Sequence, residues 1–364
     1  MKCGIVGLPN VGKSTLFNAL LKKRVALSAN YPFATVEPNV GVVSVSDDRL
    51  KMLQELVRKE EHMDNLPPVV PAVVEFVDIA GLVKGASVGA GLGNQFLSHI
   101  REVDAIIHVL RDFEDENVVK AGSVDPRSDR AVVETELALA DLQVLEKLID
   151  GLEKEKEADP FRQEKLTILK QMGENLSSQG QALRGYEGGN EKLKSWFEHL
   201  PLLSIKPVLY VYNMGEDGYA DKLRDPLLVT QDDNIFICAK LEEELADLKE
   251  EERSQYLKEL GISETGLERL IKKAYQLLGL ISFLTAGKKE VRAWTIKNGT
   301  KAPQAAGVIH TDFEKKFIRA EVVEYEKLIE AGSHLAVKSK GWVRTEGKDY
   351  IMKDGDVVEF LVSS

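Results

Sequence analysis

The sequence predicts an α/β protein with three parts: a mostly parallel sheet with helices on both faces, an inserted helical arm and a small C-terminal α+β domain. Two observations predict the sheet. Short β-rich runs alternate with helical stretches, and a glycine loop directly follows the first run. A third observation, leucines at helical spacing between about 128 and 200, predicts the arm.

The predicted strands are short apolar runs rich in valine, isoleucine and aromatic residues. They lie at 2–7, 40–45, 73–77, 105–110, 207–212 and 235–238. Helical patterning follows the first strand at 14–21 and returns at 241–279. Strands that alternate with helices in this way are typical of a parallel sheet covered on both faces.

The strand pattern breaks at about 128–200, where two helical segments follow one another. The seams consist of Leu142, Leu145, Ile149 and Leu152, and then, after a turn near Asp159, of Leu166, Leu169, Met172 and Leu176. Spacings of three and four indicate two antiparallel helices that form a narrow coiled-coil arm. Strand-like sequence resumes at 207, so the arm is predicted to be an insertion. The alternative is that both helices pack on the sheet.

The chain changes character at about 280. Further β-type runs are predicted at 291–296, 318–323, 349–352 and 356–362, with turns between them. We therefore expect one domain at 1–279, interrupted by the arm, and a second domain at 280–364.

The composition limits the possible environments and partners. The formal charge of −11 argues against general electrostatic binding of nucleic acid, but 280–364 holds 14 lysines and arginines against 12 acidic residues. Any RNA contact would therefore use a local basic patch, most plausibly in this segment. The sequence has two cysteines, no apolar run of transmembrane length and no signal peptide. These features favour a cytoplasmic protein without membrane contact.

Residues 7–14 read Gly-Leu-Pro-Asn-Val-Gly-Lys-Ser and match the phosphate-binding loop G-x-x-x-x-G-K-[S/T]. Backbone N–H groups of such a loop curl around phosphates, and the following helix adds its positive end. Lys13 is expected to reach the β- and γ-phosphates, and the Ser14 hydroxyl to bind Mg²⁺.

Two further segments lie where such an enzyme needs them. Asp78 follows a hydrophobic strand and can hold the magnesium shell through water, and the Gly81 amide can face the γ-phosphate. Thr35 has the spacing of a switch residue that binds Mg²⁺ only while a γ-phosphate is present.

The predicted base-reading segment departs from the guanine pattern N-K-x-D. Residues 213–216 read Asn-Met-Gly-Glu, so the lysine position holds Met214 and the carboxylate of Glu216 is one methylene longer. Guanine discrimination should weaken, because it needs a well-matched carboxylate. Asn213 and backbone groups could form the hydrogen bonds that adenine needs, and Met214 could pack on the adenine ring. Cys238 and Ala239 belong to the next base loop. ATP is favoured over GTP.

The position of the usual catalytic glutamine holds Leu82, which cannot form a hydrogen bond with its side chain. Slow intrinsic hydrolysis is therefore expected, and no catalytic residue is assigned. His99, Arg101 and His108 are nearby in sequence, but His108 lies in an apolar strand and is predicted to belong to the core. The glycine-rich stretch 85–94 predicts a mobile switch or, alternatively, a rigid turn.

Together these motifs resemble the Obg-related nucleotidases. The segments at 7–15, 30–35 and 78–86 carry the resemblance, and Asn-Met-Gly-Glu at 213–216 narrows it to the Obg-like ATPase branch, known in bacteria as the YchF family. The stretches at 285–294 and 308–314 are similar to the TGS domain of that family.

The resemblance implies a P-loop NTPase G domain, an inserted coiled-coil arm, a C-terminal TGS domain of β-grasp shape and a ribosome-binding ATPase. It implies nucleotide contacts by Asn10, Val11, Gly12, Lys13, Ser14 and Thr15, magnesium at Ser14 and Thr35, and Met214 at the base. The expected partner is the ribosome (large subunit or 70S), with ribosomal RNA contacted through the TGS domain and the arm. A monomer is expected. The open alternatives are an Obg-type GTPase and an RNA-binding scaffold whose nucleotide is mainly structural.

Overall fold

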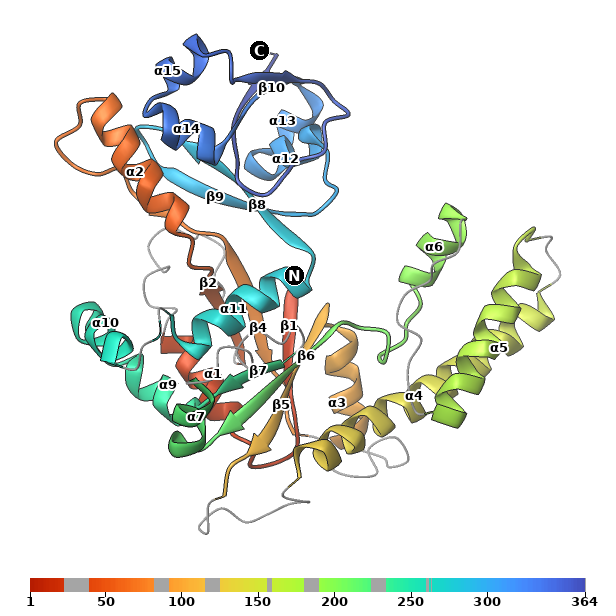
Figure 1. Cartoon of the computed structure of the whole chain (residues 1–364). Coiled ribbons are helices and arrows are strands. Elements are labelled where there is room, and N and C mark those ends of the chain that lie inside the picture. The colour runs from red at the N-terminus through yellow and green to blue at the C-terminus, as the bar shows by residue number, and fades with distance from the viewer. Residues whose placement is uncertain are drawn as a thin grey trace. The chain divides into compact units, whose positions relative to one another are not determined.

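The structure is a computed structural model, and it describes residues 1–22, 39–81, 92–114, 125–155, 159–179, 190–223, 234–259, 262 and 264–363. These residues form two compact units. The first holds 1–22, 39–41 and the described part of 75–267, and the second holds 42–74 and 268–363. Both units are seen in Figure 1, and each is considered by itself.

A six-stranded sheet of order β2-β4-β1-β5-β6-β7 forms the centre of the first unit, and its strands β2 and β4 continue into residues that are grouped with the second. Its strands are β1 (Lys2–Val6), β2 (Val40–Ser44), β4 (Val73–Asp78), β5 (Ala105–Asp112), β6 (Val208–Met214) and β7 (Asn234–Ile237). The pairs β4/β1, β1/β5, β5/β6 and β6/β7 are parallel. Strand β5 is buried along almost its whole length, as expected for a strand covered on both faces.

Helices connect these strands, as the alternating pattern predicted. They are α1 (Lys13–Lys22), α3 (Leu92–Arg101), α7 (Glu216–Leu223), α9 (Ala239–Leu245) and α10 (Glu250–Glu259). Helix α1 packs against α9. The parallel pairing places the carboxyl ends of β1, β4, β5 and β6 at one edge of the sheet, where ligands bind in open α/β folds.

The predicted arm has a hydrophobic core of its own. It consists of α4 (Pro126–Lys154), α5 (Arg162–Gln179) and α6 (Glu191–Glu198), and Figure 1 shows α5 lying along the distal part of α4. Leu145, Leu169, Met172 and Leu176 are buried in this core together with Phe197 of α6. Helix α4 contacts β5, and Figure 1 shows its distal part extending with α5 away from the sheet, so the helices form an arm rather than a layer on the sheet.

Asp141 joins the arm to the segment that returns to the sheet. Its side chain is fully buried and accepts hydrogen bonds from the backbone N–H groups of Leu203 (2.8 Å) and Ser204 (2.8 Å), and from the Ser204 hydroxyl. Burial raises the pKa of Asp141, and these hydrogen bonds partly oppose that rise. The carboxylate therefore holds the start of the return segment against α4.

The second unit contains a mixed six-stranded sheet of order β11-β10-β12-β8-β9-β3. Its strands are β3 (Val69–Val70), β8 (Leu280–Ala286), β9 (Val291–Lys297), β10 (Phe317–Glu324), β11 (Arg344–Glu346) and β12 (Asp356–Val362). The central pair β8/β12 is parallel, whereas β8/β9 and β10/β12 are antiparallel. Helix α12 (Ala302–Ile309) packs against the sheet through Ala302, Ala305 and Ala306, which gives a β-grasp arrangement.

Residues far apart in the sequence complete this second unit. Helix α2 (Asp48–Glu60) packs on β8 and β9, and β3 pairs in parallel with the outer edge of β9. The remaining helices are α11 (Gly266–Leu277), α13 (Thr311–Lys315), α14 (Tyr325–Ala331) and α15 (His334–Ser339). Helix α11 begins at the boundary between the two units.

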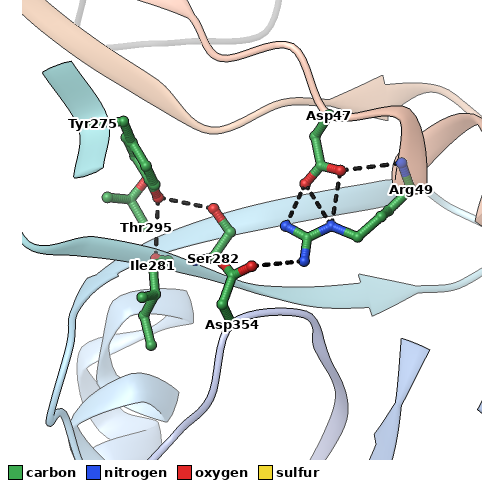
Figure 2. Close-up of polar contacts among 7 residues, drawn as sticks. All are labelled: Asp47, Arg49, Tyr275, Ile281, Ser282, Thr295 and Asp354. Atoms are coloured by element: carbon green, nitrogen blue, oxygen red, sulfur yellow. Dashed lines mark hydrogen bonds and ion pairs between the residues drawn. The ribbon is translucent and has the colours of Figure 1, made fainter. Parts of the chain in front are cut away.

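A polar network fastens α2 to the C-terminal sheet, as Figure 2 shows. Arg49 donates through Nε and Nη2 to Asp47, the residue that caps α2, and through Nη1 to Asp354 at 2.8 Å. The other oxygen of Asp354 accepts from the backbone N–H of Ser282 at 2.9 Å. The Ser282 hydroxyl in turn lies 2.8 Å from the Tyr275 hydroxyl of α11.

The fold class predicted from the sequence is confirmed, and the elements differ in detail. Strand β8 was not predicted, and the run at 349–352 was wrongly predicted as a strand, because it forms only an isolated bridge at Ile351. The predicted domains at 1–279, 128–200 and 280–364 stay predictions, and the compact units differ from them at 42–74. No helix in the described part of the chain is long and apolar enough to cross a membrane.

Candidate nucleotide-binding site

The glycine loop connects β1 to α1 at the carboxyl edge of the first sheet. Gly12 has a left-handed φ of 93°, and Asn10 has a φ of 63°, a conformation that asparagine adopts more readily than most other residues with a side chain. A Cβ atom on Gly7 would lie 2.5 Å from the Val109 carbonyl oxygen of β5. Close packing at Gly7 and the left-handed φ at Gly12 therefore favour glycine at these two positions. Ser14 is exposed at the start of α1.

Lys13 is buried beneath this loop. Its ammonium group donates to the carbonyl oxygens of Gly7 (3.0 Å) and Leu8 (2.8 Å), and only 8% of the residue is exposed. Burial lowers the pKa of Lys13, and the charge of Asp78 opposes that change. Burial likewise raises the pKa of Asp78, and the positive charge of Lys13 opposes that rise. The two predicted residues are therefore brought close enough to interact electrostatically.

Gly81 lies directly beside this ammonium group. A Cβ atom at Gly81 would meet the Lys13 ammonium nitrogen at 3.0 Å and the Gly7 carbonyl oxygen at 3.4 Å. The backbone of Gly81 therefore lies next to the phosphate loop, where an added side chain would crowd Lys13.

Asn213 at the end of β6 ties the phosphate loop to the second base loop. Its amide nitrogen donates to the Val11 carbonyl oxygen at 2.9 Å, and its amide oxygen accepts from the Ala239 N–H at 2.9 Å. A Cβ atom on Gly12 would lie only 2.2 Å from the same amide nitrogen. Both ends of the amide are thus hydrogen-bonded to backbone inside the protein, and Asn213 holds the two loops together.

The other predicted base-loop residues lie together at the same edge. Met214 is buried in a small cluster with Tyr219 and Cys238, and burial raises the pKa of the Cys238 thiol. Glu216 accepts a hydrogen bond from the Lys240 ammonium at 3.0 Å in an exposed ion pair. The carboxylate at the guanine-reading position is therefore partly occupied by a lysine of the next loop.

Sequence reasoning missed a neighbouring aromatic residue, Phe113, which follows β5. The Arg111 guanidinium lies 4.5 Å from the centre of the Phe113 ring and donates through Nε to the Phe113 carbonyl oxygen at 3.1 Å. A Cβ atom on Gly215 would lie 3.8 Å from Phe113 Cβ. Strand β5 pairs with β6 so that Arg111 is opposite Asn213, and this register, which the sequence does not indicate, brings Phe113 near Gly215.

His108 lies on β5 but inside the core, as predicted. It is 2% exposed, and burial, aided by Arg130 and Lys13, lowers its pKa to about 3. The ring packs 5.8 Å from Tyr210. A neutral, buried imidazole of this kind is not placed to act on a ligand at the surface of the loop.

The residues present suit Mg²⁺ in the way P-loop proteins bind it. In the part of the chain that the structure describes, no group of three histidine, cysteine, aspartate or glutamate residues could hold a metal by itself. Mg²⁺ keeps several waters and shares phosphate oxygens, so one hydroxyl and one carboxylate suffice. The exposed Ser14 and the half-buried Asp78 would offer these oxygens. Thr35 and Leu82 lie outside the described residues, as does most of 85–94.

Comparisons with known proteins cover 99% of this chain. Residues 2–171 match a family described as a 50S ribosome-binding GTPase, and residues 280–363 match YchF-GTPase_C, a family described as a protein of unknown function. The ribosome-binding ATPase YchF of Bacillus subtilis is 49% identical, with 99% of this chain and 98% of the relative covered. That of Escherichia coli O157:H7 is 48% identical over the same shares. The structure of the Schizosaccharomyces pombe YchF GTPase matches with a TM-score of 0.84 at 38% identity, over 99% of this chain and 97% of that one.

Proposed function

Because this chain belongs to the YchF family, we propose that it is a Mg²⁺-dependent nucleotide hydrolase that binds the ribosome and prefers ATP to GTP. The names of its relatives support ribosome binding and nucleotide hydrolysis, but they include both ATPase and GTPase. The preference for ATP therefore rests on the residues of the base loops.

The observation that carries the preference is the ion pair between Glu216 and Lys240. Guanine recognition needs a carboxylate free to accept two hydrogen bonds, and Glu216 already accepts one from Lys240. The lysine position of the guanine motif holds the buried Met214, which offers an apolar surface for a purine ring. Phe113 beside Gly215 adds a second such surface.

The remaining residues have defined roles in this proposal. Asn10 to Thr15 hold the phosphates, and Cys238 and Ala239 shape the base loop that Asn213 anchors. Mg²⁺, held by Ser14, by Thr35 and through water by Asp78, would neutralise phosphate charge. Leu82 supplies no group to orient water, so turnover should be slow without a partner. The protein would work as a monomer in the cytoplasm and contact ribosomal RNA through the C-terminal TGS domain and the arm.

Calorimetric titration with ATP and GTP tests the proposal directly. Tighter binding of ATP is expected, and the double variant Met214→Lys with Glu216→Asp, which rebuilds the guanine motif, should shift the ratio towards GTP. Lys13→Ala should weaken the binding of both nucleotides, and this variant is the control for a general loss of the site. Micromolar GTP binding with no measurable ATP binding would instead establish an Obg-type GTPase.

The scaffold alternative is distinguished by ribosome co-sedimentation. If nucleotide controls binding, wild-type protein with ATP should co-sediment more strongly than without nucleotide, and Lys13→Ala should abolish the difference. Equal co-sedimentation in all cases, together with negligible turnover on ribosomes, would indicate that the nucleotide is mainly structural.

A further inference from the structure

Arg111, near the end of β5, is a buried arginine to which the proposed function gives no role. Only 6% of the residue is exposed. Its strand places it opposite Asn213 of β6, the residue that holds the phosphate loop to the next base loop. A guanidinium always carries its charge, and removing that charge from water is costly unless neighbouring groups compensate. The contacts of this guanidinium therefore indicate what it stabilises.

The guanidinium makes two contacts with Phe113, two residues further along the chain. Its Nε donates to the Phe113 carbonyl oxygen at 3.1 Å, and its central carbon lies over the Phe113 ring, 4.5 Å from the ring centre. A cation over an aromatic face is attracted by the ring. One contact therefore restrains the backbone of Phe113, and the other restrains its side chain.

Burial strengthens the attraction between this cation and the ring. In the part of the chain that the structure describes, Nη2 of Arg111 is buried without a hydrogen-bond partner. Burial raises the pKa of Asp129 in the first turn of α4, and the positive charge of Arg111 opposes that rise. The guanidinium thus acts on its neighbours without much screening by water, and a desolvated cation binds an aromatic ring more strongly than a solvated one.

Phe113 lies beside the base loop at 213–216. Its Cβ is 3.8 Å from the position that a Cβ atom on Gly215 would take. Phe113 is only half-buried, so part of the residue stays open although Arg111 covers one face of the ring. A ring that is fixed before the ligand arrives loses less conformational freedom on binding, and this improves affinity.

We propose that Arg111 is a positioning residue for nucleotide binding, which holds the Phe113 ring so that its open part stacks against the purine. The inference rests on the proposed place of Phe113 beside the base, and it does not depend on the preference for ATP. Every base has a face that can stack. Arg111 should therefore affect ATP and GTP alike and should not affect a ligand that consists of phosphates alone.

Competition against a fluorescent nucleotide measures the affinities of ATP, GTP and tripolyphosphate for the full-length protein with Mg²⁺. Arg111→Met removes the cation and keeps an unbranched side chain. It should weaken ATP and GTP roughly threefold to tenfold and leave tripolyphosphate within about twofold of wild type. Arg292→Met is the matched control, because the Arg292 guanidinium lies 3.8 Å from the centre of the Trp294 ring in the second unit. It should change none of the three affinities.

A double-variant cycle tests whether Arg111 acts through Phe113. Phe113→Leu alone should weaken both nucleotides, and adding Arg111→Met to it should have little further effect. Circular dichroism checks that each variant is folded. If Arg111→Met is unfolded, Arg111→Lys takes its place and should weaken both nucleotides in the same way, because lysine keeps the buried charge but lacks the planar group that stacks and donates.

Three results would overturn the inference. Unchanged affinities of ATP and GTP in Arg111→Met would exclude a positioning role. An equal loss of tripolyphosphate binding would show that Arg111 only supports the fold of the phosphate loop. Losses that multiply in the double variant would show that Arg111 does not act through Phe113.

Failure of the proposed function has different signs. An unchanged affinity in Phe113→Leu would remove Phe113 from the base site and refute the inference with it. Binding of GTP without ATP by the wild-type protein would refute the preference for ATP alone, and the effect of Arg111→Met would then still be measured with GTP.

Discussion

The guanidinium of Arg49 donates to the carboxylate of Asp354 over 2.8 Å and joins two residues that are 305 positions apart in the chain. The contact places the start of α2 against the turn that precedes β12. Gly355 in that turn has a φ of 80°, and a Cβ atom there would meet Arg49 Nη1 at 2.7 Å. The turn is therefore shaped to admit the guanidinium.

Arg49→Ala should destabilise the second unit by about 1–3 kcal/mol, because it leaves the carboxylates of Asp47 and Asp354 without their shared cation. Urea unfolding followed by the fluorescence of Trp294 and Trp342, with Trp196 of the arm replaced by phenylalanine, measures the effect. Arg58→Ala is the matched control on the same helix, since its exposed pair with Glu55 should contribute less than about 1 kcal/mol. Equal losses in both variants would contradict a special role of Arg49.

Asn213→Ala should weaken ATP and GTP binding alike, by tenfold or more. The substitution leaves the Val11 carbonyl and the Ala239 N–H buried without partners, at a cost of about 1–3 kcal/mol each. Titration of a fluorescent nucleotide gives the affinities. A change in the ATP-to-GTP ratio without a general loss would mean that Asn213 reads the base.

Gly12→Ala should abolish nucleotide binding, because its φ of 93° disfavours a side chain and the added Cβ would collide with Asn213. Gly151→Ala in α4 is the contrasting control. A Cβ at Gly151 meets nothing within 4 Å, so this variant should bind nucleotide normally and gain up to about 1 kcal/mol of stability. Normal nucleotide affinity in Gly12→Ala would show that the loop can rearrange.

Asp141→Ala should loosen the base of the arm and cost about 2–4 kcal/mol, since the N–H groups of Leu203 and Ser204 lose their acceptor. Trp196, which packs against the core of the arm, reports the change by fluorescence during unfolding. Asp150→Ala on the same helix removes only an exposed pair with Lys154 and should have little effect. An unchanged unfolding midpoint for Asp141→Ala would refute this anchoring role.

Glu60 should make the second unit sensitive to acid. Burial raises the pKa of Glu60, but hydrogen bonds from His334 outweigh it and hold the pKa below the ordinary 4.5. The ionised carboxylate therefore stabilises the folded state above the ordinary pKa, and this stabilisation is lost as the pH falls through the lowered value. Glu60→Gln should be less stable than wild type at pH 7, with a gap that closes as the pH falls below the ordinary pKa and through the lowered one. A gap independent of pH would contradict the assignment.

The sequence was most informative where one local pattern determines one element. The glycine loop, the strand ending at Asp78 and the leucine seams of the arm were all predicted, because their signals lie within a few residues. The actual partners of Asn213 were not, since Val11 and Ala239 come from separate loops that only the parallel sheet brings together. The approach of Phe113 to Gly215 was missed for the same reason.

The composition of the second unit was also beyond local patterns. Residues 42–74 were predicted to belong to the same domain as the first sheet, and no local pattern near β3 indicates that it pairs with β9. Such pairing depends on contacts between residues more than two hundred positions apart, and hydrophobic periodicity does not detect such contacts.

The grouping of 42–74 with 268–363 means that the chain passes between the two units at 41–42, 74–75 and 267–268. Removing everything after 279 would consequently not yield an intact N-terminal protein. It would strip α2 of the strands that cover it and leave Leu50, Leu53 and Val57 open to water, which favours aggregation. Loss of activity after such a deletion would therefore report a damaged hydrolase rather than a missing accessory module.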